Sequence, residues 1–163
     1  MKERLEQRLK ELKDEFESGQ KMLADLEARQ DELRNTLMRI SGAVLVLENK
    51  IFSRGHNSSL QNCDPTSHAE IVAIRKACGL RNNYRIPDCD LYVTLEPCAM
   101  CLGAAVQARI RRLVFGAYDP KAGAVQSIMQ FPFDSMNHRI EVRGGILSEE
   151  CGQILKDFFR DKR

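Results

Sequence analysis

Two short segments of this chain carry the residue types that hold and use a metal ion. His68 and Glu70 stand two residues apart, and Cys98 and Cys101 follow in a Pro-Cys-x-x-Cys arrangement. One imidazole and two thiols suit zinc, and three protein ligands leave the fourth tetrahedral position open for a water. A structural zinc site would close that position with a fourth cysteine or histidine. The spacing therefore predicts one catalytic zinc ion per chain, with His68, Cys98 and Cys101 as its ligands.

The carboxylate beside the histidine predicts hydrolytic chemistry. Zinc lowers the pKa of a bound water from about 16 to about 7, so hydroxide is available at neutral pH. We expect Glu70 to take the proton of that water, to pass it to a ring nitrogen of the substrate and then to protonate a leaving amine. The alternative is a zinc-stabilised fold without activity. A His-x-Glu pair followed by Pro-Cys-x-x-Cys is typical of zinc-dependent nucleobase deaminases, and it favours catalysis.

The composition predicts a soluble protein. Charged residues make up 29% of its 163 residues, no apolar run approaches 18 residues, and the N-terminus is charged from Lys2 onward. We therefore expect neither a membrane span nor a secretory signal. Six cysteines without an export signal favour a reducing compartment, the cytoplasm, over a disulfide framework. Outside the metal segments, the cysteines are expected to be small buried hydrophobic residues: Cys63, Cys78, Cys89 and Cys151.

The charge distribution leaves the partner open. The net charge of +2 is too small to identify a polyanionic partner by itself. Basic residues gather in segments 109–112 and 156–163, where they either meet phosphates or form solvated faces.

Residues 1–40 differ from the rest of the chain and are predicted to be a separate helical segment. They contain no proline, and their apolar residues recur at alternating steps of four and three, with Gly19 and Gln30 as exceptions. This pattern predicts a long helix with a heptad-like stripe, although residues 17–20 could also form a turn in a helical hairpin. The stripe either dimerises as a coiled coil or packs against the protein's own sheet, and we favour the second interpretation.

From residue 41 the pattern changes to alternating strands and helices, which predicts an α/β domain over residues 41–163. Thr66 is expected to cap a helix that runs to about Cys78, after a polar loop over 57–65. Pro97 is expected to open a helix that runs to about Arg109, and Ser148 to cap a last one. Both metal segments then fall at helix starts, where the positive helix end favours thiolates. The expected strands are 43–47, 51–56, 91–95, 112–115 and 140–143.

These residues make the chain similar to the cytidine-deaminase-like superfamily and, within it, to the bacterial tRNA-specific adenosine deaminases. The zinc segments are common to the whole superfamily, and the later segments point to the tRNA branch. The resemblance covers residues 42 to 160, nearly three quarters of the chain. It rests on segments 42–46, 55–57, 64–70, 91–101, 114–117 with Asp119 and Lys121, 136–139 and 157–160.

The resemblance implies a three-layer cytidine-deaminase-like fold, with a central mixed sheet of about five strands flanked by helices. The implied reaction converts the wobble adenosine of a tRNA to inosine, in an anticodon loop whose bases can be splayed into the pocket. It also implies a homodimer. By this similarity Asn57 would hydrogen-bond the flipped base, Asp119 would lie near the ribose 2′-hydroxyl, and Phe159 and Arg160 would border the anticodon loop. Each of these four residues also has a purely structural interpretation in a turn or in the core.

The N-terminal part departs from the family pattern. Residues 38–42 read Met-Arg-Ile-Ser-Gly where the family has Glu-Val-Pro-Val-Gly, and the preceding helical segment is atypical, with a regular composition like that of a designed helix. Since that approach helps to wall the base pocket in the family, other substrates stay open. These are cytosine in single-stranded nucleic acid and a free base or nucleoside such as guanine. An alternative of another class is a helix-mediated assembly protein with an inactive deaminase-like module.

Overall fold

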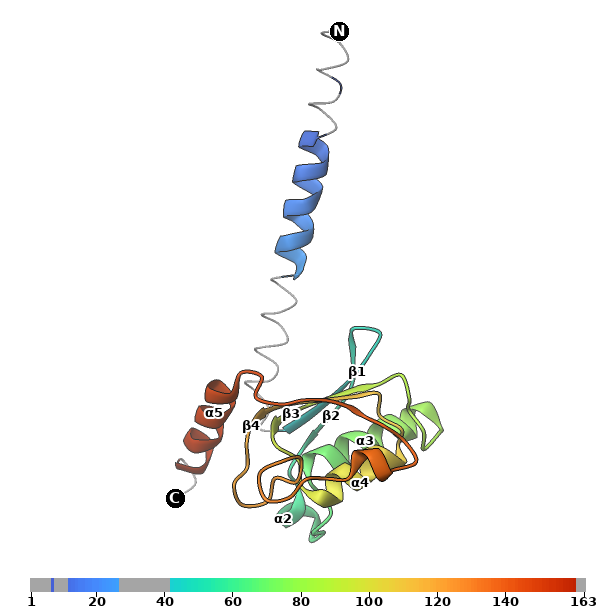
Figure 1. The fold of residues 1–163 in the computed structure, drawn as a ribbon, viewed down its shortest axis with the longest axis vertical. Coiled ribbons are helices and arrows are strands. Elements are labelled where there is room, and N and C mark those ends of the chain that lie inside the picture. The colour runs from blue at the N-terminus through green and yellow to red at the C-terminus, as the bar shows by residue number, and fades with distance from the viewer. Residues whose placement is uncertain (1–6, 8–11, 27–41, 161–163) are drawn as a thin grey trace. The chain divides into compact units, whose positions relative to one another are not determined.

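The computed structural model describes residue 7, residues 12–26 and residues 42–160 (Figure 1). The chain divides into two units, Met1–Thr36 and Leu37–Arg163, and each is described by itself. The boundary expected at residue 40 lies outside the described residues and stays a prediction. Among the residues described, no helix combines the length and the apolar character needed to cross a membrane.

The described part of the first unit is one helix over residues 12–26. It continues through Ser18 and Gly19, so the alternative of a turn at residues 17–20 is wrong. A glycine inside a helix costs about 1 kcal/mol relative to alanine, which the surrounding helix-forming Leu, Glu and Lys residues can offset. The large apolar side chains of this helix are exposed: Leu12, Phe16, Met22, Leu23 and Leu26.

A five-stranded mixed sheet forms the centre of the second unit. The strand order is β2-β1-β3-β4-β5. The β1 strand pairs antiparallel with β2 and β3, whereas β4 runs parallel to both β3 and β5. The sheet confirms the predicted mixed topology, and each strand overlaps its predicted range. The bounds are β1 Gly42–Leu47, β2 Lys50–His56, β3 Asp90–Leu95, β4 Arg112–Ala117 and β5 Glu141–Arg143.

Helices cover both faces of this sheet, which gives the expected three layers (Figure 1). Leu113 and Phe115 of β4 point to one face and share a buried core with residues of α3 and α4. Gly116 points to the other face, where an added Cβ would lie 2.3 Å from Sγ of Cys151 in α5. The helices are α2 Ser59–Asn62, α3 Ala69–Arg81, α4 Ala99–Gln107 and α5 Ser148–Arg160, with a 3-10 turn, η1, at Phe133–Ser135.

The helix starts differ from the predicted ones. The N-cap of α3 is His68 rather than Thr66, because the Thr66 hydroxyl and N–H both donate to the Asp64 carboxylate. An Asx turn therefore uses the residue that was expected to cap the helix. The N-cap of α4 is Cys98, so Pro97 precedes the helix instead of opening it. The predicted polar loop 57–65 contains the short helix α2.

Gly55 of β2 allows α3 to approach the sheet closely. A Cβ at Gly55 would lie 2.1 Å from the Ala69 carbonyl oxygen and 2.6 Å from the Ala73 nitrogen. On the same strand, the buried Ser53 hydroxyl donates to the carbonyl of Ala73 in α3 at 2.8 Å. These contacts set the height of α3 above the sheet, and with it the position of His68 at its start.

Candidate metal centre and catalytic carboxylate

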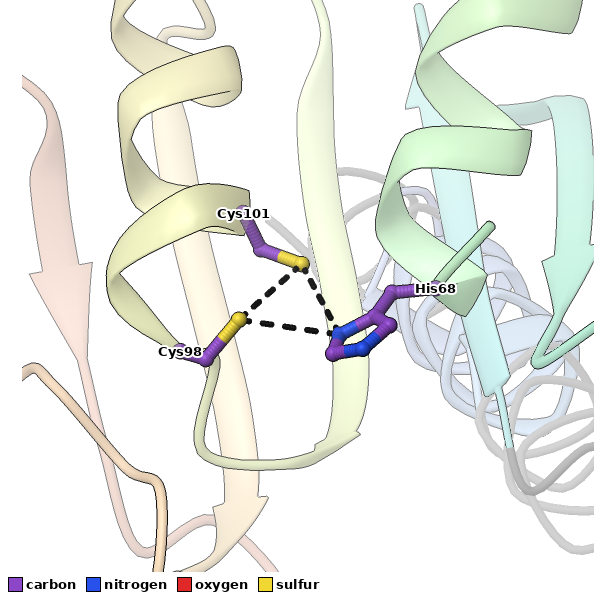
Figure 2. Close-up of side chains that lie close together, drawn as sticks. All are labelled: His68, Cys98 and Cys101. Carbon is purple, nitrogen blue, oxygen red and sulfur yellow. Dashed lines mark hydrogen bonds between the residues drawn. The ribbon is translucent and has the colours of Figure 1, made fainter. Parts of the chain in front are cut away.

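His68, Cys98 and Cys101 come together at the starts of α3 and α4 (Figure 2). The Nδ1 atom of His68 lies 3.6 Å from Sγ of Cys98 and 3.6 Å from Sγ of Cys101, and the two sulfurs are 3.7 Å apart. Within residues 12–26 and 42–160 this is the one group of at least three such side chains whose ligand atoms lie close enough to share an ion. The sequence-predicted ligand set is therefore assembled in space.

The triangle of ligand atoms has the dimensions of a zinc site. With metal–sulfur distances of about 2.3 Å and a metal–nitrogen distance of about 2.0 Å, tetrahedral angles place the sulfurs about 3.8 Å apart and each sulfur about 3.5 Å from the nitrogen. The observed separations of 3.7 and 3.6 Å agree with these values. Three ligands complete three corners of the tetrahedron, so the donor set fits a zinc ion that keeps one corner for a non-protein ligand.

Two helix starts bring the ligands to one place. His68 and Cys98 are the N-caps of α3 and α4, and both have extended backbone conformations. Cys101 is the third residue of α4, so its sulfur faces the same side as that of the cap residue. The N-terminal ends of both helices carry partial positive charge, which favours negatively charged sulfur at this point.

A hydrogen bond between the two sulfur atoms shifts the pKa values of the two thiols in opposite directions. A hydrogen bond with Cys101 lowers the pKa of the Cys98 thiol to about 5, and the backbone N–H groups of Cys101 and Met100 act in the same direction. The same hydrogen bond, together with burial, raises the pKa of Cys101. A thiolate is thus already favoured at Cys98 before any ion binds, and a bound dication would favour the deprotonated form of both sulfurs.

Glu70 is the second residue of α3 and lies beside the ligand cluster. Burial raises the pKa of its carboxyl, and the negative charge of Cys98 raises it further. The carboxyl lies within hydrogen-bonding reach of the Cys101 thiol. A carboxyl group with a raised pKa beside the ligand cluster has the chemistry to accept and return a proton.

The histidine side of the site, residues 57–70, is held by a half-exposed carboxylate. Asp64 accepts hydrogen bonds from the Thr66 hydroxyl at 2.6 Å and the Ser67 hydroxyl at 2.8 Å. These bonds lower the pKa of Asp64. The Ser67 carbonyl accepts from the Ser58 N–H at 2.9 Å, which ties Asn57 and its neighbours to the residue before His68.

The cysteine side, residues 95–101 with 117–128, is held by a buried carboxylate. Glu96 is 3% exposed. Burial alone would raise its pKa, but hydrogen bonds from Ser127, Gln126 and Asp119 lower the pKa of Glu96 on balance. The sequence patterns predicted no role for Glu96. A single charged residue between a buried strand and Pro97 was the signal that could have drawn attention to it.

The predicted substrate residues lie in different settings. The exposed Asn57 uses its Oδ1 to accept from the N–H and hydroxyl of Ser59, at 3.2 and 3.0 Å, so it shapes the turn into α2. Asp119 is half-buried and its Oδ1 accepts from the Lys121 N–H at 2.9 Å. Arg160 is exposed and forms an ion pair with Asp157 at 3.0 Å. The backbone of Phe159 belongs to α5, and its side chain lies outside the described part.

The first basic segment, 109–112, is engaged largely in ion pairs. Arg111 contacts Asp90 at 2.8 Å, and Arg112 contacts Glu141 at 3.0 Å. These residues stand at the starts of the parallel strands, whereas the ligands follow the strand ends. The pairs favour the solvated-face interpretation for Arg111 and Arg112. The last residues of the second basic segment, 161–163, lie outside the described residues.

The remaining cysteines only partly match the expectation of burial. Cys89 and Cys151 are buried, as predicted, and Cys78 is half-buried. Cys63 is exposed, and that prediction is wrong, because it caps the C-terminal end of α2 in a left-handed conformation with φ 48°.

Known proteins are similar in sequence to most of this chain. The family model described as MafB19-like deaminase matches residues 13–163. A tRNA-specific adenosine deaminase of Haemophilus influenzae is 51% identical over 125 residues, which cover 75% of this chain and 72% of the relative. Proteins with the same description from Agrobacterium fabrum and Bacillus subtilis are 48% and 44% identical, cover 75% of this chain and are themselves covered over 81% and 76%.

Solved structures share the fold. One comes from work on A-to-I editing by tRNA:A34 deaminases at the wobble position of transfer RNA. It is 46% identical, has a TM-score of 0.65, and the match covers 69% of this chain and 83% of that one. A guanine deaminase from Nitrosomonas europaea has a TM-score of 0.59 at 22% identity, with 78% and 79% of the two chains covered. At that identity the second likeness concerns the fold alone.

Proposed function

This chain matches the MafB19-like deaminase family and belongs to the tRNA-specific adenosine deaminases, and from that premise we propose that it converts adenosine to inosine at the wobble position of a tRNA. One observation carries the proposal. A three-residue ligand triangle with zinc dimensions stands next to a half-buried carboxyl, in a chain that is 40–51% identical to curated tRNA-specific adenosine deaminases.

In this proposal His68, Cys98 and Cys101 hold one zinc ion. A zinc ion supplies the acidity that lets a water act as a nucleophile near neutral pH. Glu70 would take one proton from that water and deliver it to N1 of the adenine ring while the water oxygen bonds to C6. It would then carry the second proton from that oxygen to the exocyclic amine, so that the C6–N6 bond breaks, ammonia leaves and the C6 oxygen becomes the carbonyl of inosine. Its raised pKa suits this work, because a more basic carboxylate accepts a proton more readily.

Four further residues are proposed to hold the substrate. The Oδ1 of Asn57 is engaged with Ser59, so its Nδ2 is the group to donate to the flipped base. Asp119 meets the 2′-hydroxyl of the target ribose, which distinguishes RNA from DNA at that position. Phe159 and Arg160, on the last turn of α5, border the anticodon loop.

We extend the proposal to a cytoplasmic homodimer. Several large apolar residues of the second unit are exposed, and a second copy would remove them from water. They include Leu60, Tyr118, Ile128, Met129, Ile146 and Leu147. Sedimentation equilibrium on the full chain tests this assembly, and the same measurement on residues 41–163 tests whether the N-terminal helix takes part.

The test of the function is ammonia release from a panel of substrates. Zinc-loaded protein is given an anticodon stem-loop with adenosine at the wobble position, the matching stem-loop with guanosine there, free guanine, free cytidine and a single-stranded DNA oligomer. We expect turnover on the first substrate, with inosine found by nucleoside analysis. Activity confined to a free base or to cytosine would overturn the tRNA assignment. Inactivity on the whole panel would favour the assembly function.

The role of Glu70 is tested by Glu70→Gln. We expect a loss in kcat of at least about 10²-fold with zinc content unchanged, because removal of a general acid–base costs 10²–10⁴-fold. Glu149→Gln is the matched control, since Glu149 is also the second residue of a helix, α5, and is exposed. Near-normal turnover by zinc-loaded Glu70→Gln would contradict the assigned role.

A further inference from the structure

Glu96 holds a loop that the reaction chemistry does not use directly. Its carboxylate accepts backbone N–H groups from Asp119 at 3.1 Å, Gln126 at 2.8 Å and Ser127 at 3.1 Å. The Ser127 hydroxyl donates to the same carboxylate. Three of the four donors are main-chain groups, so this single side chain fixes the path of residues 119–127.

The loop is also fastened to the segment that carries Cys98. The Glu96 N–H donates to the Ala117 carbonyl at 2.8 Å, and the Ala124 N–H donates to the Pro97 carbonyl at 2.9 Å. Gly123 packs directly on the carboxylate, because an added Cβ would lie 2.3 Å from Oε2 of Glu96 and 2.7 Å from the Asp119 carbonyl. The loop therefore has little room to shift relative to Cys98, two residues beyond Glu96.

From these contacts we propose that Glu96 is a positioning residue for substrate binding, which acts by fixing Asp119 at the sugar of the target nucleotide. This inference rests on the proposed function, in which Asp119 meets the ribose 2′-hydroxyl. Glu96 is buried, and its two oxygens already accept four hydrogen bonds, so it acts through the loop rather than on the substrate.

The substitution Glu96→Gln separates the contacts. A glutamine keeps the length of the side chain and one carbonyl oxygen, which can still accept from the Gln126 and Ser127 N–H groups. Its NH₂ group then faces the Asp119 N–H, donor against donor, while the Ser127 hydroxyl can turn and accept. The change therefore removes the contact to Asp119 and leaves that N–H without a partner at the carboxylate.

We expect Glu96→Gln to raise KM for the stem-loop about tenfold, which corresponds to the loss of one buried hydrogen bond. The value of kcat is expected to stay within about threefold, and zinc content to stay at one ion per chain. The matched control is Glu141→Gln, a carboxylate at the start of β5, near the opposite ends of the parallel strands. Its KM is expected to match that of the unchanged protein.

A substrate change tests whether the effect passes through the sugar. The stem-loop is prepared with 2′-deoxyadenosine at the target position only, and KM is measured for both forms. If Glu96 acts through Asp119, Glu96→Gln raises KM for the ribose form and has little effect on the deoxy form. A general disturbance of the fold would raise KM for both forms equally, and that result would overturn the inference.

Two further measurements keep the test decisive. Ser127→Ala removes one donor to Glu96 and leaves its other hydrogen bonds in place. It replaces Glu96→Gln in the test if that variant does not fold. We expect the ratio of KM for the deoxy form to KM for the ribose form to fall two- to threefold. The melting temperature and zinc content of each variant are measured alongside. Failure of the unchanged protein to deaminate the stem-loop would count against the proposed function, whereas equal effects on both sugars in an active protein count against Glu96 alone.

Discussion

The two sides of the metal cluster are supported by different kinds of hydrogen bond. On the histidine side, the half-exposed Asp64 accepts mainly from side chains, namely the hydroxyls of Thr66 and Ser67 and the Arg75 guanidinium, and also from the Thr66 N–H. On the cysteine side, the buried Glu96 accepts mainly main-chain N–H groups from a distant loop. The first arrangement orders a local turn, and the second joins two segments some 30 residues apart in the sequence.

The difference suggests where each side tolerates change. Asp64 is half-exposed, so water can replace a donor that its carboxylate loses, although Ser67 itself is only 2% exposed. Buried main-chain donors have no such substitute and must keep their acceptor. We therefore expect the cysteine side to be the more sensitive of the two, and three predictions bear on this comparison, from the largest expected effect to the smallest.

Removal of a ligand should have the largest effect and should differ between the sides. His68→Ala and Cys101→Ala are both expected to abolish turnover and to lose zinc, because neither leaves three ligands. Cys101 is 1% exposed and His68 only half-buried, so Cys101→Ala should give the lower melting temperature. Zinc is measured by mass spectrometry and stability by calorimetry, with the exposed Cys63→Ala as control. Full zinc occupancy in either ligand variant would contradict the ligand assignment.

A side chain added at either of two closely packed glycines should have an intermediate effect on stability. Gly55→Ala and Gly123→Ala each place a Cβ within 2.3 Å of a neighbouring atom, which typically costs about 1–3 kcal/mol of unfolding free energy. Gly55→Ala acts on the height of α3, and Gly123→Ala acts on the Glu96 contacts and should also raise KM. Gly79→Ala in α3 is the control, since it meets nothing within 4 Å and should stabilise by about 0.5–1 kcal/mol. Denaturant unfolding measures the unfolding free energy of each variant. Equal values for all three variants would contradict the importance of these close contacts.

Removal of the Asp64 charge should have the smallest effect, a pH-dependent loss of unfolding free energy. Its pKa is lowered in the folded protein, so the ionised carboxylate stabilises the fold above the unfolded value, near 3.8, and this contribution is lost as pH falls below it. Asp64→Asn should therefore be less stable than the unchanged protein at pH 7, and the gap should narrow below about pH 4. Urea unfolding between pH 3 and 7 measures the gap. A gap that stays constant over this range would show that the charge of Asp64 does not matter.

Much of this site was predictable because spacing in the sequence carries direct geometric meaning. Cys98 and Cys101 are three residues apart at a helix start, which brings both sulfurs to one side, and His68 shares the same kind of position. The continuous apolar run 43–47 and the segment 91–95, rich in apolar residues, likewise identify buried strands. These features depend on neighbours in the chain.

The missed features depend on residues that are distant in the sequence or on competition between local bonds. Thr66 looks like a helix cap, and only the nearby Asp64 carboxylate diverts its hydroxyl. The place of Glu96 after a buried strand marks it as unusual, but its partners cannot be identified from sequence, because its donors lie 23 to 31 residues later and are mostly backbone groups that any residue type could supply. The continuity of the helix through Gly19 was open for a similar reason, since a single glycine is compatible with both outcomes.

The order of the ligands and strands along the chain has a consequence for folding during translation. All three ligands are outside the ribosome once residue 101 has emerged from the exit tunnel, whereas β4, β5 and α5 emerge later. An ion can thus bind while β3 is still an edge strand. It would then link the starts of α3 and α4 in the nascent chain before the sheet is complete. The carboxylate of Glu96 must wait for its donors until residue 127 emerges, so metal capture and loop closure are separate events during translation.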